Sequence, residues 1–214
     1  TYLFSANTRE VYNYNISKEN SVRGDFSPND LIREDRTTEG TTSEFSTNLG
    51  YEINPSSSVR FNALYSDGDG PTELYRLTTD LKVQPNTAVR EREFTPQLNR
   101  NWEVGGDYEF NLARGDRFKI LFISNEMDRA STRERFALQT DGSEQKNLFL
   151  DTASVTQERI VRSSFTFDLA AGQDIELGAE RAQTILDSNL KLGLASSTGT
   201  PSPAFGGLVP QQVA

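Results

Sequence analysis

The stretch of sequence that decides the fold is Trp102-Glu103-Val104-Gly105-Gly106-Asp107-Tyr108-Glu109-Phe110-Asn111-Leu112. Its even positions carry Trp, Val, Gly, Tyr, Phe and Leu, whereas its odd positions carry Glu, Gly, Asp, Glu and Asn. Successive side chains of a β-strand point to opposite faces, so this period of two predicts a strand with one apolar and one polar face.

The end of this stretch recurs at a fixed interval along the chain. Tyr51-Glu52-Ile53-Asn54, Tyr108-Glu109-Phe110-Asn111 and Phe165-Thr166-Phe167-Asp168 are separated by 57 residues, since 108 − 51 and 165 − 108 both equal 57. Each copy ends an alternating strand, and a second strand departs at 60, 117 and 174. The repeating unit is therefore a long β-hairpin.

The connections between the expected strands alternate between short and long. The short ones are Asn54-Pro55-Ser56-Ser57, Ala113-Arg114-Gly115-Asp116 and Ala170-Ala171-Gly172-Gln173, each with Pro or Gly suited to a tight turn. The long ones, residues 17–42, 67–93 and 130–156, are rich in charged residues, Ser and Thr, and often still alternate, as if the strands continued well past the apolar windows before turning. Short turns on one side and long outward loops on the other are typical of membrane barrels.

The composition excludes several classes of function. The net charge of −9 and pI near 4.7 disfavour a nucleic-acid partner, because phosphate contacts dominate that affinity. The chain contains no Cys and no His, which excludes thiolate chemistry, disulfides, His-based acid–base catalysis and most transition-metal sites. We expect no enzyme activity, no catalytic residue, no metal site and no cofactor.

The apolar windows suit a membrane only in the form of strands. No apolar run approaches the roughly 20 residues that a transmembrane helix needs. The alternating windows span about 9 to 11 residues, the length of a tilted strand that crosses hydrocarbon. Only a closed barrel satisfies the backbone hydrogen bonds of such strands inside lipid.

Aromatic residues cluster at the two ends of the apolar windows, as in the aromatic girdles of membrane barrels. The candidate membrane-interface residues are Phe45, Tyr51, Tyr65, Trp102, Tyr108, Phe110, Phe122, Phe165 and Phe167. The other strand face carries mixed charges suited to a wet lumen. Its charged residues are Glu52, Arg60, Glu103, Asp107, Glu109, Arg117, Lys119, Arg162, Asp168, Glu176 and Glu180.

The hairpins resemble those of a known family. Residues 159–167 followed by 175–182, together with Trp102 to Phe110, are similar to the down-turn-up hairpins in the barrel of TonB-dependent outer-membrane receptors. In that family a barrel of 22 strands surrounds an N-terminal plug, and the ligand binds at the outer loops and plug apex. The TonB complex drives uptake with the proton gradient of the inner membrane. The resemblance maps no ligand-binding residue onto a position of this sequence.

These observations predict an all-β fold: an antiparallel, up-and-down transmembrane β-barrel segment of about seven long strands. Residues 1–214 form one partial barrel domain, which we expect to begin in mid-hairpin at Thr1 and to stop in a loop at Ala214. The resemblance implies a receptor in the bacterial outer membrane that imports an unknown small ligand such as an iron chelate. Its partners would be outer-membrane lipid and, through a plug outside this segment, the TonB complex.

Two other classes of protein also fit the pattern. One is a passive porin-like or structural outer-membrane barrel, and the other is a soluble β-sandwich binding module, whose strands also alternate. An upstream plug would distinguish a receptor from a porin. Heat-modifiable migration in detergent would distinguish a barrel from a sandwich.

Four short motifs have both a functional and an ordinary interpretation. Arg-Gly-Asp at 23–25 and 114–116 could present an adhesive ligand, but Gly among polar residues is usual turn chemistry. Asp67-Gly68-Asp69-Gly70 offers two carboxylates to calcium yet lacks the rest of a calcium loop. Asn15-Ile16-Ser17 is a chance glycosylation tripeptide. Glu103, Asp107 and Glu109 share one strand face, which favours a hydrated wall over an acid–base pair.

Overall fold

The protein forms one antiparallel β-sheet of ten strands in a computed structural model that describes residues 1–112, 115–170 and 172–212. A 3-10 turn, Pro203–Phe205, precedes the last strand. The strands are β1 (Tyr2–Val22), β2 (Pro28–Asn54), β3 (Ser57–Asp69), β4 (Thr72–Asp80), β5 (Thr87–Thr95), β6 (Gln97–Asn111), β7 (Arg117–Leu138), β8 (Glu144–Ala170), β9 (Gln173–Leu194) and β10 (Val209–Gln211).

The structure has ten strands instead of the expected seven because two expected strands are divided and β10 forms in the C-terminal segment that was expected to be a loop. β3 pairs with residues 42–54 of β2, and β4 pairs with residues 30–38 of the same strand. The two strands therefore lie end to end along β2, as one strand interrupted by a break. β6 and β5 lie beside them in the same way. The breaks fall at Pro71 and Pro96, which have no N–H to donate to a neighbouring strand.

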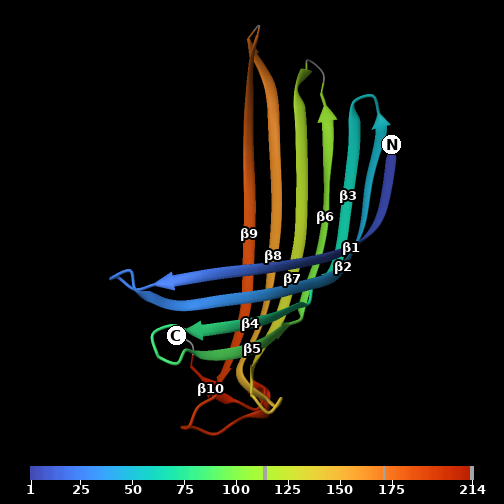
Figure 1. Cartoon of the computed structure of the whole chain (residues 1–214). Helices are drawn as coiled ribbons and strands as arrows, with labels where there is room; N and C mark the ends of the chain where they lie inside the picture. Colours follow the sequence, from blue (N-terminus) through green and yellow to red (C-terminus); the bar gives the residue numbers. More distant parts are fainter. Residues whose placement is uncertain (113–114, 171, 213–214) are drawn as a thin grey trace.

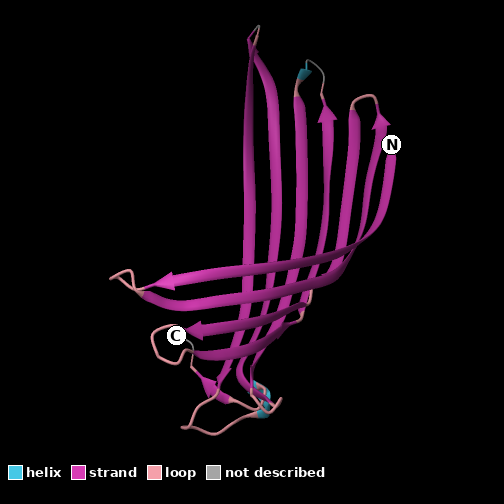
Figure 2. Cartoon of the chain, in the orientation of Figure 1, coloured by secondary structure: helices cyan, strands magenta, loops and turns pink. Residues whose placement is uncertain are grey.

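The sheet is curled and has two open edges. In Figure 1 the upper ends of β3, β6, β7, β8 and β9 stand side by side, and the lower halves of β1, β2, β4 and β5 sweep across in front of the later strands. Figure 2 shows that strands make up almost the whole molecule. β1 pairs only with β2, and β10 covers β9 only at residues 192–194. Closure into a barrel therefore stays a prediction.

The expected long outward loops are wrong: those residues form strands that end in short connections. β1 and β2 are joined by residues 23–27, β4 and β5 by 81–86, and β7 and β8 by 139–143. The expected continuation of the strands past the apolar windows is confirmed, but it reaches to within a few residues of the hairpin tips, which leaves no long loop. The asymmetry between the two ends of the sheet lies in the polar length of the strands, not in the loops.

Two of these hairpin tips have the same turn. Oδ1 of Asp25 accepts hydrogen bonds from the amide and hydroxyl of Ser27, and Oδ1 of Asp141 accepts the same two from Ser143. The residue between them has a positive φ, 64° at Phe26 and 84° at Gly142. The Asp side chains therefore close both turns, although one of them places a bulky residue in the left-handed region.

At the opposite end of the sheet the expected tight turns are described in part. The β2–β3 turn is closed by Oδ1 of Asn54, which accepts a hydrogen bond from the Ser56 amide at 2.9 Å. Of the other two, residues 113–114 and 171 lie outside the described residues. The segment from Ser196, expected to be a loop, contains β10 and the 3-10 turn.

The sheet has almost no hydrophobic core. Among the described residues the only buried hydrophobic side chains are those of Leu74, Leu208 and Val209. A β-sandwich would bury the inner faces of two packed sheets, and the described residues form a single layer, which disfavours the sandwich alternative. No helix in the described part of the chain is long and apolar enough to cross a membrane.

Candidate functional site

One face of the sheet, the apolar face, carries all nine predicted interface aromatics. Residues paired directly across neighbouring strands point to the same side of the sheet. Phe45 pairs with Tyr65, which pairs with Trp102, and Phe110 pairs with Phe118, which pairs with Phe165. The remaining members follow by alternation along each strand. Whether this face meets lipid stays a prediction.

The apolar face is open to its surroundings. Tyr51 is 68% exposed, Phe45 48% and Phe122 46%. β1 extends the same face with Tyr2 and Phe4, which are also exposed and pair with Leu49 and Thr47. A contiguous exposed apolar surface of this kind usually marks a contact with protein or membrane.

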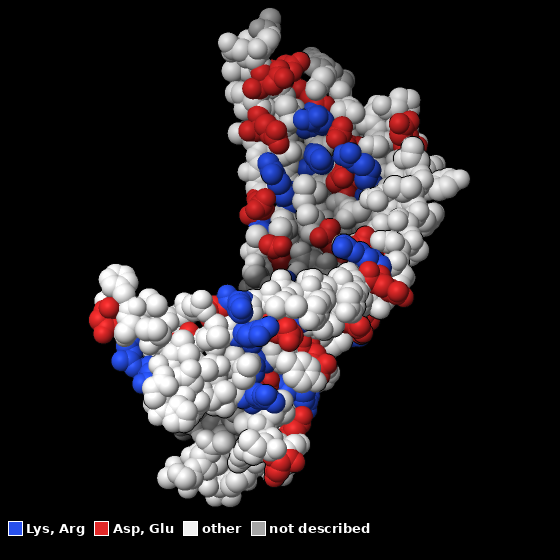
Figure 3. Space-filling view, viewed as in Figure 1, with Lys and Arg blue, Asp and Glu red and all other residues white. Residues whose placement is uncertain are grey.

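The opposite side, the charged face, carries every residue predicted for the wet wall. Figure 3 shows both signs of charge mixed over the upper half of the sheet, on the side towards which the lower strand halves curl. The alignment Arg60, Asp107, Leu121, Arg162 and Glu180 runs across five strands. Leu121 is a hydrophobic residue at a position of β7 that alternation assigns to the charged face, and it lies between Asp107 and Arg162.

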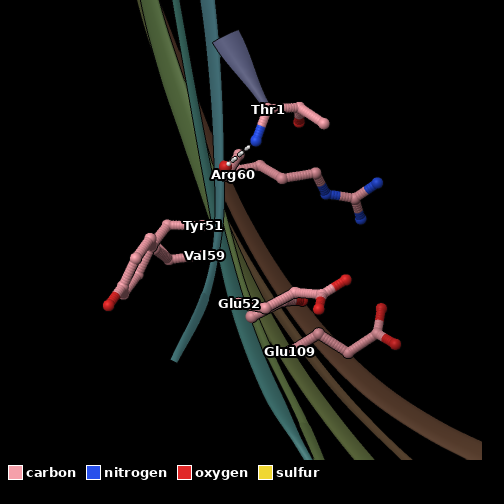
Figure 4. Close-up of a pocket in the computed structure, with 8 residues that line it drawn as sticks. Thr1, Tyr51, Glu52, Val59, Arg60 and Glu109 are labelled. Atoms are coloured by element: carbon pink, nitrogen blue, oxygen red, sulfur yellow. Dashed lines mark hydrogen bonds between the residues drawn. The ribbon is translucent and has the colours of Figure 1, made fainter. Parts of the chain in front are cut away.

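The side chains of the two faces can be compared at a depression of about 500 Å³ beside the N-terminus. Figure 4 shows Tyr51 and Val59 on one side of the strands and Glu52, Arg60 and Glu109 on the other. The Thr1 ammonium donates to the carbonyl oxygen of Gly50 at 2.7 Å. This depression borders an open edge of the sheet and has no enclosed polar pocket.

The charges near the short turns are only partly paired. Arg60 donates through Nε to Oδ1 of Asp107 at 3.0 Å. Arg117, Lys119 and Arg162 line a second depression of about 250 Å³ together with Glu109 and Glu176. Both signs of charge therefore line this part of the wall, as expected for a hydrated surface.

At the hairpin-tip end the charged face carries a chain of ion pairs that sequence reasoning missed. Arg76 on β4 contacts Glu34 on β2 at 2.6 Å and Glu91 on β5 at 3.8 Å. Arg135 on β7 contacts Glu91 at 3.3 Å and donates to Asn147 on β8 at 2.9 Å. These contacts connect five strands, β2, β4, β5, β7 and β8, on the side of the sheet opposite to the apolar face. Only the register across the strands reveals it.

A second missed cluster lies beyond the aromatics, on the same side of the sheet as the apolar face. Arg92 on β5 forms two hydrogen bonds with Glu144, through Nε at 3.0 Å and Nη2 at 2.6 Å, and its guanidinium lies 4.8 Å from the Phe136 ring centroid. The hydrogen bond from Arg92 holds the pKa of the Glu144 carboxyl below its usual value. Burial, and then the hydrogen bond to Glu73, raises the pKa of Tyr75 beside it. The cluster links β5 to β8 across β7.

A third missed feature is a depression of about 320 Å³ on the charged face, lined by β6, β7, β8 and β9. Arg129 lies among amide and hydroxyl side chains there. A sequence signal existed, because Gln97 and Asn99 occupy the polar positions of β6 where charged residues stand elsewhere. The register of four strands was needed to bring them to Arg129.

The short motifs take ordinary roles where the structure describes them. Asp25 closes its own turn, and Arg114 of the second Arg-Gly-Asp lies outside the described residues. Asp69 accepts the Thr41 amide at 2.8 Å, and Asp67 lies 3.6 Å from Arg100, so neither carboxylate is free at a loop tip. Asn15 lies within β1.

Two of the carboxylates considered for an acid–base pair interact with other side chains. Asp107 is paired with Arg60, and Glu103 lies 3.5 Å from the Asn62 amide. Within the described ranges no group of three acidic side chains is arranged to hold a metal ion.

Comparison of the chain with family models, with curated proteins and with solved structures gives no match. The function is therefore inferred from the two faces of the sheet and from the resemblance of the hairpins.

Proposed function

We propose that this chain forms part of the wall of a β-barrel in the bacterial outer membrane, and that the whole protein is a TonB-dependent receptor importing a small ligand such as an iron chelate. One observation carries the proposal. A single antiparallel sheet has an exposed apolar face rich in aromatics and, on its other side, a charged face.

Lipid is the environment that best accounts for the apolar face. Burial of apolar surface contributes roughly 25 cal/mol per Å², so a wide apolar surface left in water forgoes much of the stability of a fold. The apolar part of β6, from Trp102 to Phe110, spans nine residues. A tilted strand needs about 9–11 residues to cross the hydrocarbon of a membrane.

The length of the strands fits the same proposal. β8 has 27 residues and is therefore about 90 Å long, far more than a membrane requires. Its polar half, with the ion pairs near the hairpin tips, would project from the membrane into water. The charged face would line the hydrated interior of the barrel.

A receptor is favoured over a passive porin by the resemblance of the hairpins, and the charged face suits either interior. Conductance of the full-length protein in a planar lipid bilayer distinguishes the two. A plugged receptor is expected to insert and conduct little, whereas a steady open-channel conductance would favour the porin. A full-length protein that is soluble and monomeric without detergent, with no heat-modifiable migration, would overturn the membrane proposal.

A further inference from the structure

The depression of about 320 Å³ on the charged face has a lining unlike the rest of that face. Strand pairing aligns Asn99 on β6, Arg129 on β7, Ser154 on β8 and Ser188 on β9 in one row. The side chains on either side of Arg129 are small or uncharged. The guanidinium can therefore be approached from the hollow of the sheet.

The next row adds more hydrogen-bonding groups. Gln97 pairs with Ser131, which pairs with Thr152, and the Ser131 and Thr152 hydroxyl oxygens lie 2.9 Å apart. Their short side chains leave the space that makes the depression. Together the two rows present amides and hydroxyls, which can donate and accept hydrogen bonds, around the guanidinium of Arg129.

No carboxylate lines this depression, and none of the ion pairs among the described residues involves Arg129. The depression lined by Arg117, Lys119 and Arg162 differs, because Glu109 and Glu176 also line it. In a chain of net charge −9, a cation among neutral polar groups is a local exception. An anion would meet attraction here without a neighbouring carboxylate to repel it.

We infer that this depression binds a hydroxylated organic carboxylate, such as a sugar acid. The planar guanidinium of Arg129 matches a carboxylate in two parallel hydrogen bonds. Gln97, Asn99 and Thr152 supply partners for the hydroxyl groups of the ligand. A neutral sugar would leave the cation without a partner. The inference rests on the proposed function, since it takes the charged face to be open to an aqueous ligand.

Calorimetric titration of the full-length protein with D-galacturonate, D-glucuronate and D-gluconate tests the site. At least one of the three is expected to bind saturably and more tightly than D-galactose, which lacks the carboxylate. Arg129→Gln is expected to raise its Kd about tenfold, the loss of one charge-assisted hydrogen bond. Arg129→Lys is expected to lose less, because it keeps the charge.

The matched control is Arg117→Gln, which removes the same charge from the same face of the same strand. Because salt largely screens the interaction of this distant charge with the ligand, Kd is expected to change by no more than about twofold. Absence of saturable binding by all three acids, equal binding of galactose, or an equal effect of the two substitutions would overturn the inference. Binding requires neither a bilayer nor transport. If the protein forms a high-conductance channel and still binds a sugar acid through Arg129, the receptor proposal is rejected and the binding site stands.

Discussion

Nε1 of Trp102 donates a hydrogen bond to Oε1 of Glu126, and the two atoms lie 3.3 Å apart. The pair stands where the apolar face ends, because the next residue of β6 on that side is Arg100, which lies 3.6 Å from Asp67. An indole with an apolar ring and one polar N–H suits the boundary between hydrocarbon and water. Under the proposed function, this hydrogen bond marks the level at which the strands leave the membrane.

Charge is expected to be tolerated on one face of β7 and not on the other. Phe122 lies midway along the apolar face, opposite Gly106 and Val161, and not at its end as the sequence suggested. Phe122→Arg is therefore expected to destabilise the protein in lipid by about 2–4 kcal/mol. The neighbouring substitution Ile123→Arg points to the charged face and is expected to cost much less. Denaturant unfolding in lipid vesicles measures both. Equal costs would argue against lipid contact.

The pairing of Arg92 with Glu144 predicts a loss of order at the hairpin tips in acid. Because the hydrogen bond lowers the folded pKa of Glu144, its contribution is complete above about pH 4.5, the ordinary value, and is lost as the pH falls through the lower folded value. The protection of β5 amides against exchange, relative to the intrinsic exchange rate at each pH, should therefore fall over that range. Glu144→Gln should remove this pH dependence, and an unchanged acid response in the variant would assign it to other groups.

The ion-pair chain at the hairpin-tip end is expected to hold β2, β4 and β5 together. Arg76 and Glu34 are about three-quarters or more buried, so Arg76→Gln is expected to cost about 1.5–3 kcal/mol of local stability. Local opening can be measured by amide exchange in β4. Arg36→Gln is the control, since Arg36 is half exposed and 3.9 Å from Glu34, and it should cost less than about 1 kcal/mol.

Phe26 occupies a position that glycine would fill with less strain. Its φ of 64° matches the φ of 84° at Gly142 in the equivalent turn, and both residues lie in Asp-x-Ser turns. Phe26→Gly is expected to stabilise the tip by about 1 kcal/mol, and Gly142→Ala to destabilise its own by a similar amount. Exchange rates of the turn amides report both changes. A stabilising effect of Gly142→Ala would contradict the assigned conformation.

The period of two carried most of what could be predicted about the sheet. Each alternating window is a strand, and every predicted aromatic and charged residue lies on the face expected for it, because alternation alone fixes the face. The divided strands could have been predicted from Pro71 and Pro96, because proline has no N–H to donate to a neighbouring strand. The alternation also indicated that the strands continue as polar stretches past the apolar windows. It did not show how far they continue, since Thr, Ser, Arg and Glu on both faces give no contrast.

Contacts between side chains on neighbouring strands could not be predicted from the sequence for a different reason. Arg76 and Glu34 are 42 residues apart, and Asn99 meets Arg129 only through the register of β6 and β7. A shift of one residue would move these side chains to opposite faces. The positive φ at Phe26 has no sequence signal, because Phe disfavours that conformation.

Nitroxide accessibility along β7 tests the central claim most directly. The sequence contains no Cys, so single labels can be placed in turn at residues 118–123 of the protein in lipid vesicles. We predict an alternation of period two, with labels at Phe118, Ile120 and Phe122 exposed to oxygen dissolved in lipid and those at Lys119, Leu121 and Ile123 exposed to a water-soluble nickel chelate. Equal access of the nickel chelate to both sets would contradict a sheet with one face in lipid.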